Sequence, residues 1–324
     1  MPQGRITWLD RAKMVGNDLA VGLIEENLNV NPEIDELFAR NIDGTSYDTA
    51  IRIGLPSTGF RGLNKGIAAS KSEIDKRKVE CFIFGGRVEI DKAAYAAAKQ
   101  VGQTDLEVEA TEASGVALSS KISIGTQIFY GAPGANDSGF PGLRGLLPKT
   151  GSLVVDAGGT TANTGSSVFA IKTGLKDVAL VLGNGDVFSL GDFRDETLYD
   201  DEQKPFPGRV ADLCGYVGLQ VPHKNCVGRI GNLTAQAGKG CTDDLMSELY
   251  SRFPVGSKPD FFVISRRSAR QLQKDRGTAI VVNVGPGAGL TGNVAKAAPT
   301  PLMSADGVPI IISDSIVDNE AIEA

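Results

Sequence analysis

The chain has 324 residues, of which 41% are hydrophobic, and its formal net charge is −6. A chain of this length and apolar content can bury a substantial core, and its negative charge argues against a protein that coats nucleic acid through a broad basic surface. No run of about 18 consecutive apolar residues is present, so we expect no membrane span. Residues 1–18 lack the apolar stretch of a signal peptide, which favours a cytoplasmic protein.

Residues 45–90 have the pattern of a long β-hairpin. Apolar and polar residues alternate from Tyr47 to Ile53 and again from Val79 to Ile90, which is the period-two signature of strands. The interval between these arms exceeds the ~12–15 residues usual for an irregular connection. It and the start of the second arm carry six cations: Arg61, Lys65, Lys71, Lys76, Arg77 and Lys78. A mobile loop and a partner-binding loop both fit, and the alternation on both flanks favours the partner-binding loop.

An unusually long helix is predicted after Asp91. Asp91 is a good N-cap residue, and the alanines between Ala93 and Ala98 have high helix propensity. An apolar stripe at helical spacing follows: Leu106, Ala110, Ala113, Ala117 and Ile124. Roughly thirty residues at ~1.5 Å each would span ~45 Å. Gly102 weakens the helix, so the pattern also allows a break there.

Side chains that usually carry catalysis are scarce. His223 is the only histidine, which excludes most catalytic triads and histidine metal sites, and we expect it in a polar surface turn. The four cysteines form no C-x-x-C pair and are predicted to be reduced thiols. No Walker-type Gly-Lys-Ser or Gly-Lys-Thr is present. We therefore predict no catalytic residue, no cofactor and no metal ion.

One motif has the spacing of a nucleotide site. The strand-like run Thr278–Val284 precedes Gly287, Gly289 and Gly292, which match the dinucleotide fingerprint. The crossover helix that should follow has no room before Pro299. A loop is the favoured interpretation, and a dinucleotide-binding oxidoreductase is the minor alternative.

Acidic residues gather in a short segment. They are Asp192, Asp195, Glu196, Asp200, Asp201 and Glu202. Such a run is usually a solvated loop, and a divalent ion or a basic partner is the alternative.

Residues 150–240 around this run are rich in strand-like segments. These are Ser167–Lys172, Val178–Leu182, Val187–Leu190 and Tyr216–Val221. Between the middle two, the glycines and asparagine of residues 183–186 predict a tight hairpin turn.

Three short strings complete the pattern. Gly139–Leu146 is a Gly/Pro loop after the helix, Lys258–Ser265 is an apolar strand followed by a helical segment, and Gly307–Asp314 is an apolar run ending in an acid. With the hairpin and the long helix before them, these strings resemble the major capsid proteins of tailed bacteriophages. The resemblance covers almost the whole chain, and encapsulin shells share the same Hong Kong 97-like fold.

The resemblance implies an α+β fold of six parts. They are an N-terminal arm (1–44), an extended loop or E-loop (45–90), a peripheral domain with a spine helix (91–149), a β-rich insertion (150–240), an axial domain (241–294) and the closing strand of the peripheral domain (295–324).

The resemblance also implies a non-enzymatic shell subunit. Hexamers and pentamers of the chain would form an icosahedral head in the host cytoplasm and enclose double-stranded DNA without reading its sequence. Scaffolding, portal and decoration proteins are the implied partners, and no membrane is involved. The six E-loop cations are expected to contact a neighbouring subunit, with the acids of residues 192–202 as candidate partners. An encapsulin-like compartment for protein cargo is the alternative, and no covalent cross-link is assigned.

Overall fold

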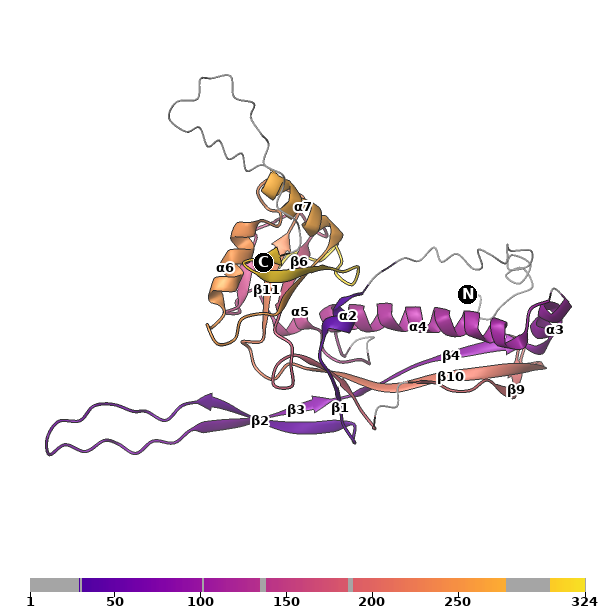
Figure 1. The fold of residues 1–324 in the computed structure, drawn as a ribbon, viewed down its shortest axis with the longest axis horizontal. Coiled ribbons are helices and arrows are strands. Elements are labelled where there is room, and N and C mark those ends of the chain that lie inside the picture. The colour runs from indigo at the N-terminus through magenta and orange to yellow at the C-terminus, as the bar shows by residue number, and fades with distance from the viewer. Residues whose placement is uncertain are drawn as a thin grey trace, which may run out of the picture.

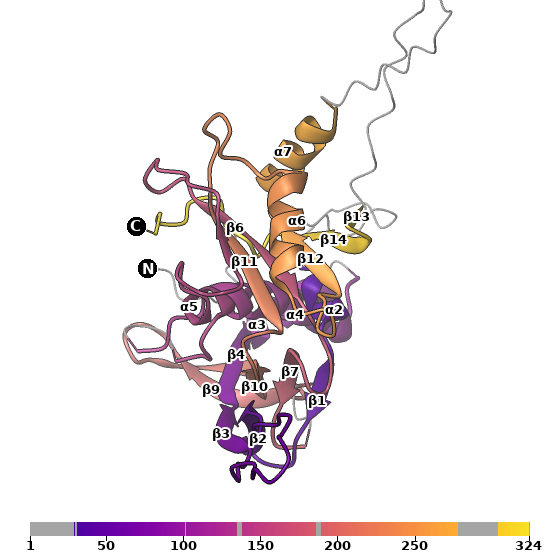
Figure 2. The ribbon, with the colours of Figure 1, turned by 90° about the vertical axis from the view of Figure 1, so that its left-hand side faces the viewer.

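The computed structural model describes residues 29, 31–100, 102–134, 138–185, 189–277 and 304–323. The molecule is elongated (Figure 1). A compact unit lies on one side of a long helix, a long sheet lies on the other side, and a hairpin projects from one end. Viewed from the hairpin end, the compact unit and the hairpin lie on opposite sides of the long helix (Figure 2).

The compact unit is built on a six-stranded mixed sheet, here called the upper sheet. Its strands, in spatial order, are β13 (Ser304–Ala305), β14 (Val308–Ile312), β12 (Phe261–Ile264), β6 (Ser166–Ile171), β11 (Val227–Leu233) and β5 (Val154–Asp156). The expected strand at Phe261–Ile264, the helix after it and the late strand from Val308 are confirmed. β12 and β14 pair in parallel, so the end of the chain is built into the same sheet.

Both faces of the upper sheet are covered. Alternate residues of β6 point to opposite sides, as the pleat of a strand requires. Val168 and Ala170 pack in a core with α6 (Asp243–Arg252) and α7 (Arg266–Gly277). Phe169 and Ile171 face the end of the long helix, where the rings of Phe129 and Phe169 lie 4.9 Å apart. This double burial explains why these strands are continuous apolar runs.

The second sheet, here called the long sheet, is organised by one strand, β10 (Pro205–Gln220). Its other strands are β1 (Ala39–Asn41), β4 (Phe82–Asp91), β7 (Ala179–Leu182), β8 (Ser189–Leu190) and β9 (Arg194–Tyr199). The strands of residues 150–240 are thus shared between the two sheets rather than gathered in one module. The reason is that β10 needs β4 as its antiparallel partner, over Gly208–Val217.

The tight hairpin turn predicted at residues 183–186 is wrong. Leu182 of β7 lies opposite Val217 of β10, and Leu190 of β8 lies opposite Leu213 of the same strand. The two short strands therefore follow one another along β10 instead of pairing together. Asn184 still adopts the left-handed backbone (φ 57°) that made this segment look like a turn.

The long helix is divided at Gly102, as its sequence allowed. α3 (Lys92–Gln100) begins after Asp91, whose carboxylate accepts the amide of Ala93 at 2.8 Å. Gly102 has φ +83°, a conformation that other residues rarely adopt. α4 (Asp105–Tyr130) then starts on a capping box between Thr104 and Glu107. With 26 residues, α4 spans ~39 Å.

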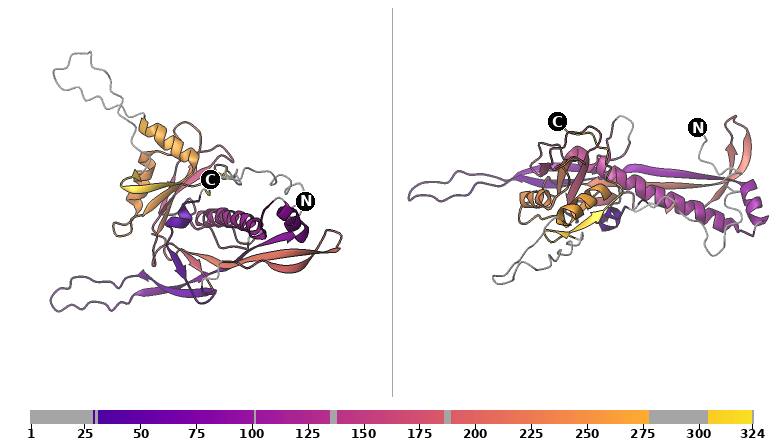
Figure 3. Two further views of the ribbon diagram at one scale, coloured as in Figure 1. Left: turned by 45° about the vertical axis from the view of Figure 1, so that its right-hand side comes forward. Right: turned by 90° about the horizontal axis from the view of Figure 1, so that it is seen from above.

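The buried face of α4 changes along its length. Val108 and Val116 pack with β4 and α3, whereas Ile124, Ile128 and Phe129 join the core beneath the upper sheet. Figure 3 shows α4 lying along the long sheet, with the compact unit at one end of the helix. The predicted stripe is therefore correct at its end, Ile124, and wrong at its beginning, where Leu106 is 76% exposed and Ala110 and Ala117 also face solvent.

The predicted hairpin is present. β2 (Ser46–Gly54) pairs antiparallel with β3 (Glu73–Glu80), and an irregular loop, residues 55–72, joins them. The expected second arm from Val79 to Ile90 divides at Cys81, because β4 leaves the hairpin to pair with β10. Before the hairpin in the sequence, the chain forms a short helix, α2 (Glu33–Glu36), which passes α4, and then enters β1. Among the described helices, none has the length and apolar character needed to cross a membrane.

A buried ion-pair network joins the upper sheet to α4. Arg229 of β11, 1% exposed, donates to Ser167 Oγ at 2.9 Å and lies 3.3 Å from Glu320. Glu320 also accepts the hydroxyl of Tyr130, the last residue of α4, at 2.6 Å. Burial and the neighbouring Glu320 carboxylate raise the pKa of Tyr130, which stays a hydrogen-bond donor. A helix, a sheet and the C-terminal segment are thus tied at one point.

Replacing Arg229 by Met should destabilise the subunit by ~1.5–3 kcal/mol, because the buried Glu320 carboxylate would lose one charged donor and keep only Arg144, 3.3 Å away, as its cation. Urea unfolding followed by circular dichroism measures this loss. The matched control is Arg266→Met, whose pair with Asp314 leaves Arg266 67% exposed and should contribute only ~0–1 kcal/mol. Equal losses for the two variants would contradict the assignment of the network as a junction.

Candidate inter-subunit surface

The base of the hairpin is anchored to the long sheet by polar contacts. The Tyr47 hydroxyl donates to the side-chain oxygen of Gln220, and the guanidinium of Arg40 lies 4.3 Å from the centre of the Tyr47 ring. The Gln220 amide donates in turn to the carbonyl of Asp177 at 2.7 Å. Burial raises the pKa of Tyr47, so the phenol stays protonated and keeps donating. The hairpin therefore leaves the body in a defined direction.

A close backbone crossing completes this anchor. β3 passes over β10 at Gly218, where a Cβ atom would meet the carbonyl oxygen of Glu80 at 2.5 Å. Any larger residue at this position would force the strands apart. Val79, the residue before Glu80, is only 7% exposed.

The two faces of the hairpin have different surroundings. Residues directly opposite one another in an antiparallel pair share a face. Arg77 lies opposite Thr49 on the face that also carries Tyr47 and the buried Val79. This face turns toward the body, because Tyr47 bonds to Gln220 of β10. Lys76 and Lys78 lie on the other face, where Lys78 pairs with Glu80 at 2.5 Å.

The loop, residues 55–72, is the least covered part of the hairpin. Its cations Arg61, Lys65 and Lys71 are all exposed, and the segment contains no acidic residue. The sequence reasoning missed its apolar side chains, although they are visible as a non-alternating series. Their exposed fractions are 78% for Leu55, 111% for Phe60, 93% for Leu63 and 55% for Ile67. Large apolar side chains gathered in one exposed segment usually mark a contact surface.

The acidic run does not form a solvated loop throughout. Asp195 and Glu196 lie in β9, where Lys92 and Arg87 pair with them at 2.7 and 3.0 Å. Lys92 holds the pKa of Asp195 below its usual value. Asp200 accepts backbone amides of the turn that leads into β10. These acids therefore have roles inside the subunit, whereas Asp192 and Asp201 have no cation within salt-bridge distance in the described ranges.

Other candidate sites are weaker. His223 lies near the surface, with Nε2 3.2 Å from Asp177. In the parts of the chain that the structure describes, no three His, Cys, Asp or Glu residues come together as a metal site. The fingerprint glycines Gly287, Gly289 and Gly292 lie outside the described residues.

Comparison with known proteins decides the family. The family model described as "Major capsid protein GP7" matches residues 18–323. The chain belongs to this family. It is thus a bacteriophage major capsid protein, a structural component of the virion, and its family is not one of enzymes. No curated protein sequence matches the chain.

Solved structures support the fold of this capsid protein. The chain resembles one in the cryo-EM structure of bacteriophage Epsilon15, with a TM-score of 0.69 and 18% identity over 100% of this chain and 99% of that chain. Weaker matches are the capsid of a native GTA particle (TM-score 0.45, 9% identity, 64% and 92% covered) and the capsid of Myoviridae phage XM1 (0.45, 10%, 71% and 100%). The predicted family and Hong Kong 97-like fold class are confirmed. Neither the encapsulin-like nor the oxidoreductase alternative gains support.

Gly218→Ala should loosen the hairpin base of the capsid protein. In the native subunit, trypsin should cut first at the exposed loop cations, because Lys76, Arg77 and Lys78 lie in a paired strand. The added methyl should expose these strand sites to cleavage, which mass spectrometry of the fragments reveals. Gly191→Ala is the control, since its Cβ would meet only Asp212 O at 3.5 Å. An unchanged cleavage order in Gly218→Ala would refute the anchor.

The four free cysteines should differ in reactivity. Burial raises the pKa of Cys226 to about 11 and that of Cys241 to about 12. At pH 8 only about one Cys226 in a thousand is then a thiolate, and the thiolate is the reactive form. Iodoacetamide should therefore modify exposed Cys214 first, with Cys226 reacting faster as the pH approaches 11. Peptide mass spectrometry gives the rates, and early labelling of Cys226 at pH 8 would count against its burial.

Proposed function

We propose that the hairpin of each capsid subunit lies on a neighbouring subunit, and that the resulting chain of contacts builds a closed icosahedral shell of hexamers and pentamers. The observation that carries the proposal is the loop of residues 55–72. It combines an anchored base with fully exposed apolar side chains such as Phe60 and Leu63. A monomer would leave this surface in water, whereas a neighbour in the shell would cover it.

The cations of the hairpin act in the same contacts. Arg61, Lys65 and Lys71 bring positive charge without any acid in the loop, and Lys76 and Lys78 extend it along the face that points away from the body. A single exposed ion pair contributes only ~0–1 kcal/mol. In a closed shell each such contact is repeated in every subunit, so modest pairs accumulate. The acids of a neighbouring subunit are the proposed partners.

The proposed shell encloses double-stranded DNA. The net charge of −6 keeps the subunit from adhering broadly to the DNA backbone, which suits a container better than a coat. We propose that a scaffolding protein and a portal, and a decoration protein where present, act with the subunit during assembly in the host cytoplasm. The assembly of subunits into a shell through such non-covalent contacts requires no catalytic group.

The test is electron microscopy of the expressed protein, in which closed uniform shells are expected. Replacing Phe60 and Leu63 together by Ser should lower the yield of shells at least tenfold, because the apolar part of the contact is removed. Circular dichroism should remain unchanged, since both side chains lie outside the core.

Val255→Ser is the control for this variant. Val255 is 92% exposed but lies in the turn after α6, so its replacement should leave shells intact. Normal shells from the Phe60/Leu63 variant would remove the loop from the assembly interface. Small oligomers alone from the native protein, even when it is expressed together with its scaffolding protein, would refute the shell itself.

A further inference from the structure

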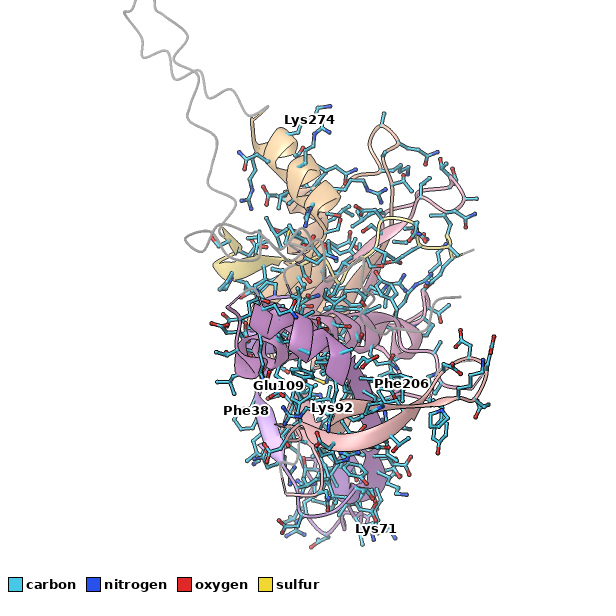
Figure 4. The ribbon with its side chains drawn as sticks, turned by 90° about the vertical axis from the view of Figure 1, so that its right-hand side faces the viewer. Phe38, Lys71, Lys92, Glu109, Phe206 and Lys274 are labelled. Carbon is cyan, nitrogen blue, oxygen red and sulfur yellow. The ribbon has the colours of Figure 1, made fainter. Side chains whose placement is uncertain are left out.

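A basic surface lies at the end of the compact unit that is farthest from the long sheet (Figure 1). Its first part is α7, which carries five cations and only one acid, Asp275. Arg266, Arg270 and Lys274 are exposed and follow at intervals of four residues. They therefore form one row along the helix, with ~6 Å between neighbours along its axis. Figure 4 labels Lys274 at the outer end of this row.

Two loops extend the surface beside α7 (Figure 2). They are residues 157–165, between β5 and β6, and residues 234–240, between β11 and α6. Neither loop contains an acidic residue, and Lys239 in the second loop is exposed. Exposed polar side chains of the two loops supply further hydrogen-bond donors. These are Thr160, Thr161, Asn163 and Gln236.

Side-chain hydrogen bonds hold the loops against α7 and against each other. The Arg267 guanidinium donates to the carbonyl of Thr164 in the first loop at 2.8 Å. The Gln271 amide donates to the first carbonyl of the second loop, also at 2.8 Å. The side-chain oxygen of Gln236 accepts the backbone amide of Thr160 at 3.0 Å, which joins one loop to the other. The helix and the two loops are therefore one connected surface.

Few acids neutralise the exposed cations of this surface. Asp314 pairs with Arg266, which nevertheless remains 67% exposed. In the described ranges, Arg270 and Lys239 have no acidic partner within salt-bridge distance. The whole chain has a net charge of −6, so this surface is a local exception. A cluster of uncompensated positive charge attracts anionic partners.

The lack of apolar groups here distinguishes between two classes of partner. Protein interfaces usually combine an apolar core with a polar rim. None of the large hydrophobic side chains that are exposed in the described ranges belongs to α7, residues 157–165 or residues 234–240. Phosphate groups, by contrast, are bound by lysine, arginine, threonine, asparagine and glutamine side chains and by backbone amides. The composition of the surface therefore favours a phosphate polymer over a protein.

We propose that α7, residues 157–165 and residues 234–240 form the surface on which the subunit contacts the phosphate backbone of the enclosed double-stranded DNA. Lys239, Arg270 and Lys274 neutralise phosphates, and the loop side chains donate hydrogen bonds to phosphate oxygens. Phosphate contacts carry no sequence information, so any DNA is accepted. This inference rests on the proposed function, since it names the part of the subunit that faces the DNA inside the shell.

DNA binding by the unassembled subunit tests the surface. The variant Lys239→Gln/Arg270→Gln removes two cations, and fluorescence anisotropy of a short labelled duplex of random sequence measures the affinity. We expect the affinity at low salt to fall at least about fivefold. The slope of log K against log salt concentration should fall by ~0.9 for each cation removed. Circular dichroism should stay unchanged, because both side chains are exposed.

The matched control is Lys176→Gln/Lys224→Gln. These two lysines are also exposed and have no acidic partner among the described residues. They lie in the loops at the opposite ends of β6 and β11, away from α7. The control should therefore bind DNA with the native affinity and the native salt dependence. An equal loss in both variants, or no loss in Lys239→Gln/Arg270→Gln, contradicts the proposal.

Formaldehyde cross-linking of DNA-filled heads locates the contact in the assembled shell. Peptides that carry Lys239 or Lys274 should be recovered linked to DNA, more often than those that carry Lys176 or Lys224. Filled heads in which neither Lys239 nor Lys274 is linked would show that this surface does not face the DNA, and would overturn the proposal.

A protein partner would give a different result. If the surface contacted a neighbouring subunit instead, Lys239→Gln/Arg270→Gln would lower the yield of shells and leave the DNA affinity of the subunit unchanged, which also overturns the proposal. Absence of shells from the native protein would overturn the proposed function. The two failures are distinguishable, because the DNA affinities are measured on subunits and the shells by electron microscopy.

Discussion

The buried contact between Arg229 and Glu320 is the point on which the geometry of the subunit depends. Arg229 belongs to the upper sheet, Glu320 to the end of the chain, and Tyr130, which donates to Glu320, ends α4. The network therefore sets the direction in which the long helix leaves the compact unit. Because α4 carries the long sheet on its first half, this direction also decides where the hairpin points. An intact buried ion pair adds little net stability. Separating its two charges inside the protein is strongly unfavourable, so arrangements of the helix and the sheet that break the pair are disfavoured.

From this junction toward the hairpin loop, less and less of the structure is buried within the subunit itself. The upper sheet is buried on both faces, and the long sheet is covered by α3 and α4 on one side. The hairpin keeps only its base in contact with the body, through Tyr47 and the crossing at Gly218. Its loop keeps none of its large apolar side chains from solvent. A capsid protein needs this gradient, since a rigid body must present an incomplete surface that a neighbour completes.

Sequence patterns were reliable where one neighbour decides the burial of a segment. The alternation of β2, the strand and helix from Phe261 onward and the break at Gly102 all follow from local rules of pleat, propensity and backbone conformation. Patterns misled where two neighbours compete. The stripe from Leu106 to Ala117 looked buried, but Glu109 and Val108 face the sheet instead, because Arg209 supplies a partner for the carboxylate. The glycines at 183–185 looked like a hairpin turn, but β10 is long enough to pair with both flanking strands.

The sequence by itself determined the order of the parts, the resemblance to phage capsid proteins, the basic hairpin and the lack of an obvious catalytic constellation. Each of these features follows from the amino-acid composition or from the spacing of residues that are close together in the sequence. Only the tertiary structure decided which strands share a sheet, which face of the hairpin turns toward the body and which acids already have partners. The physical reason is that burial and ion pairing depend on contacts between residues far apart in the chain, which local periodicity does not encode.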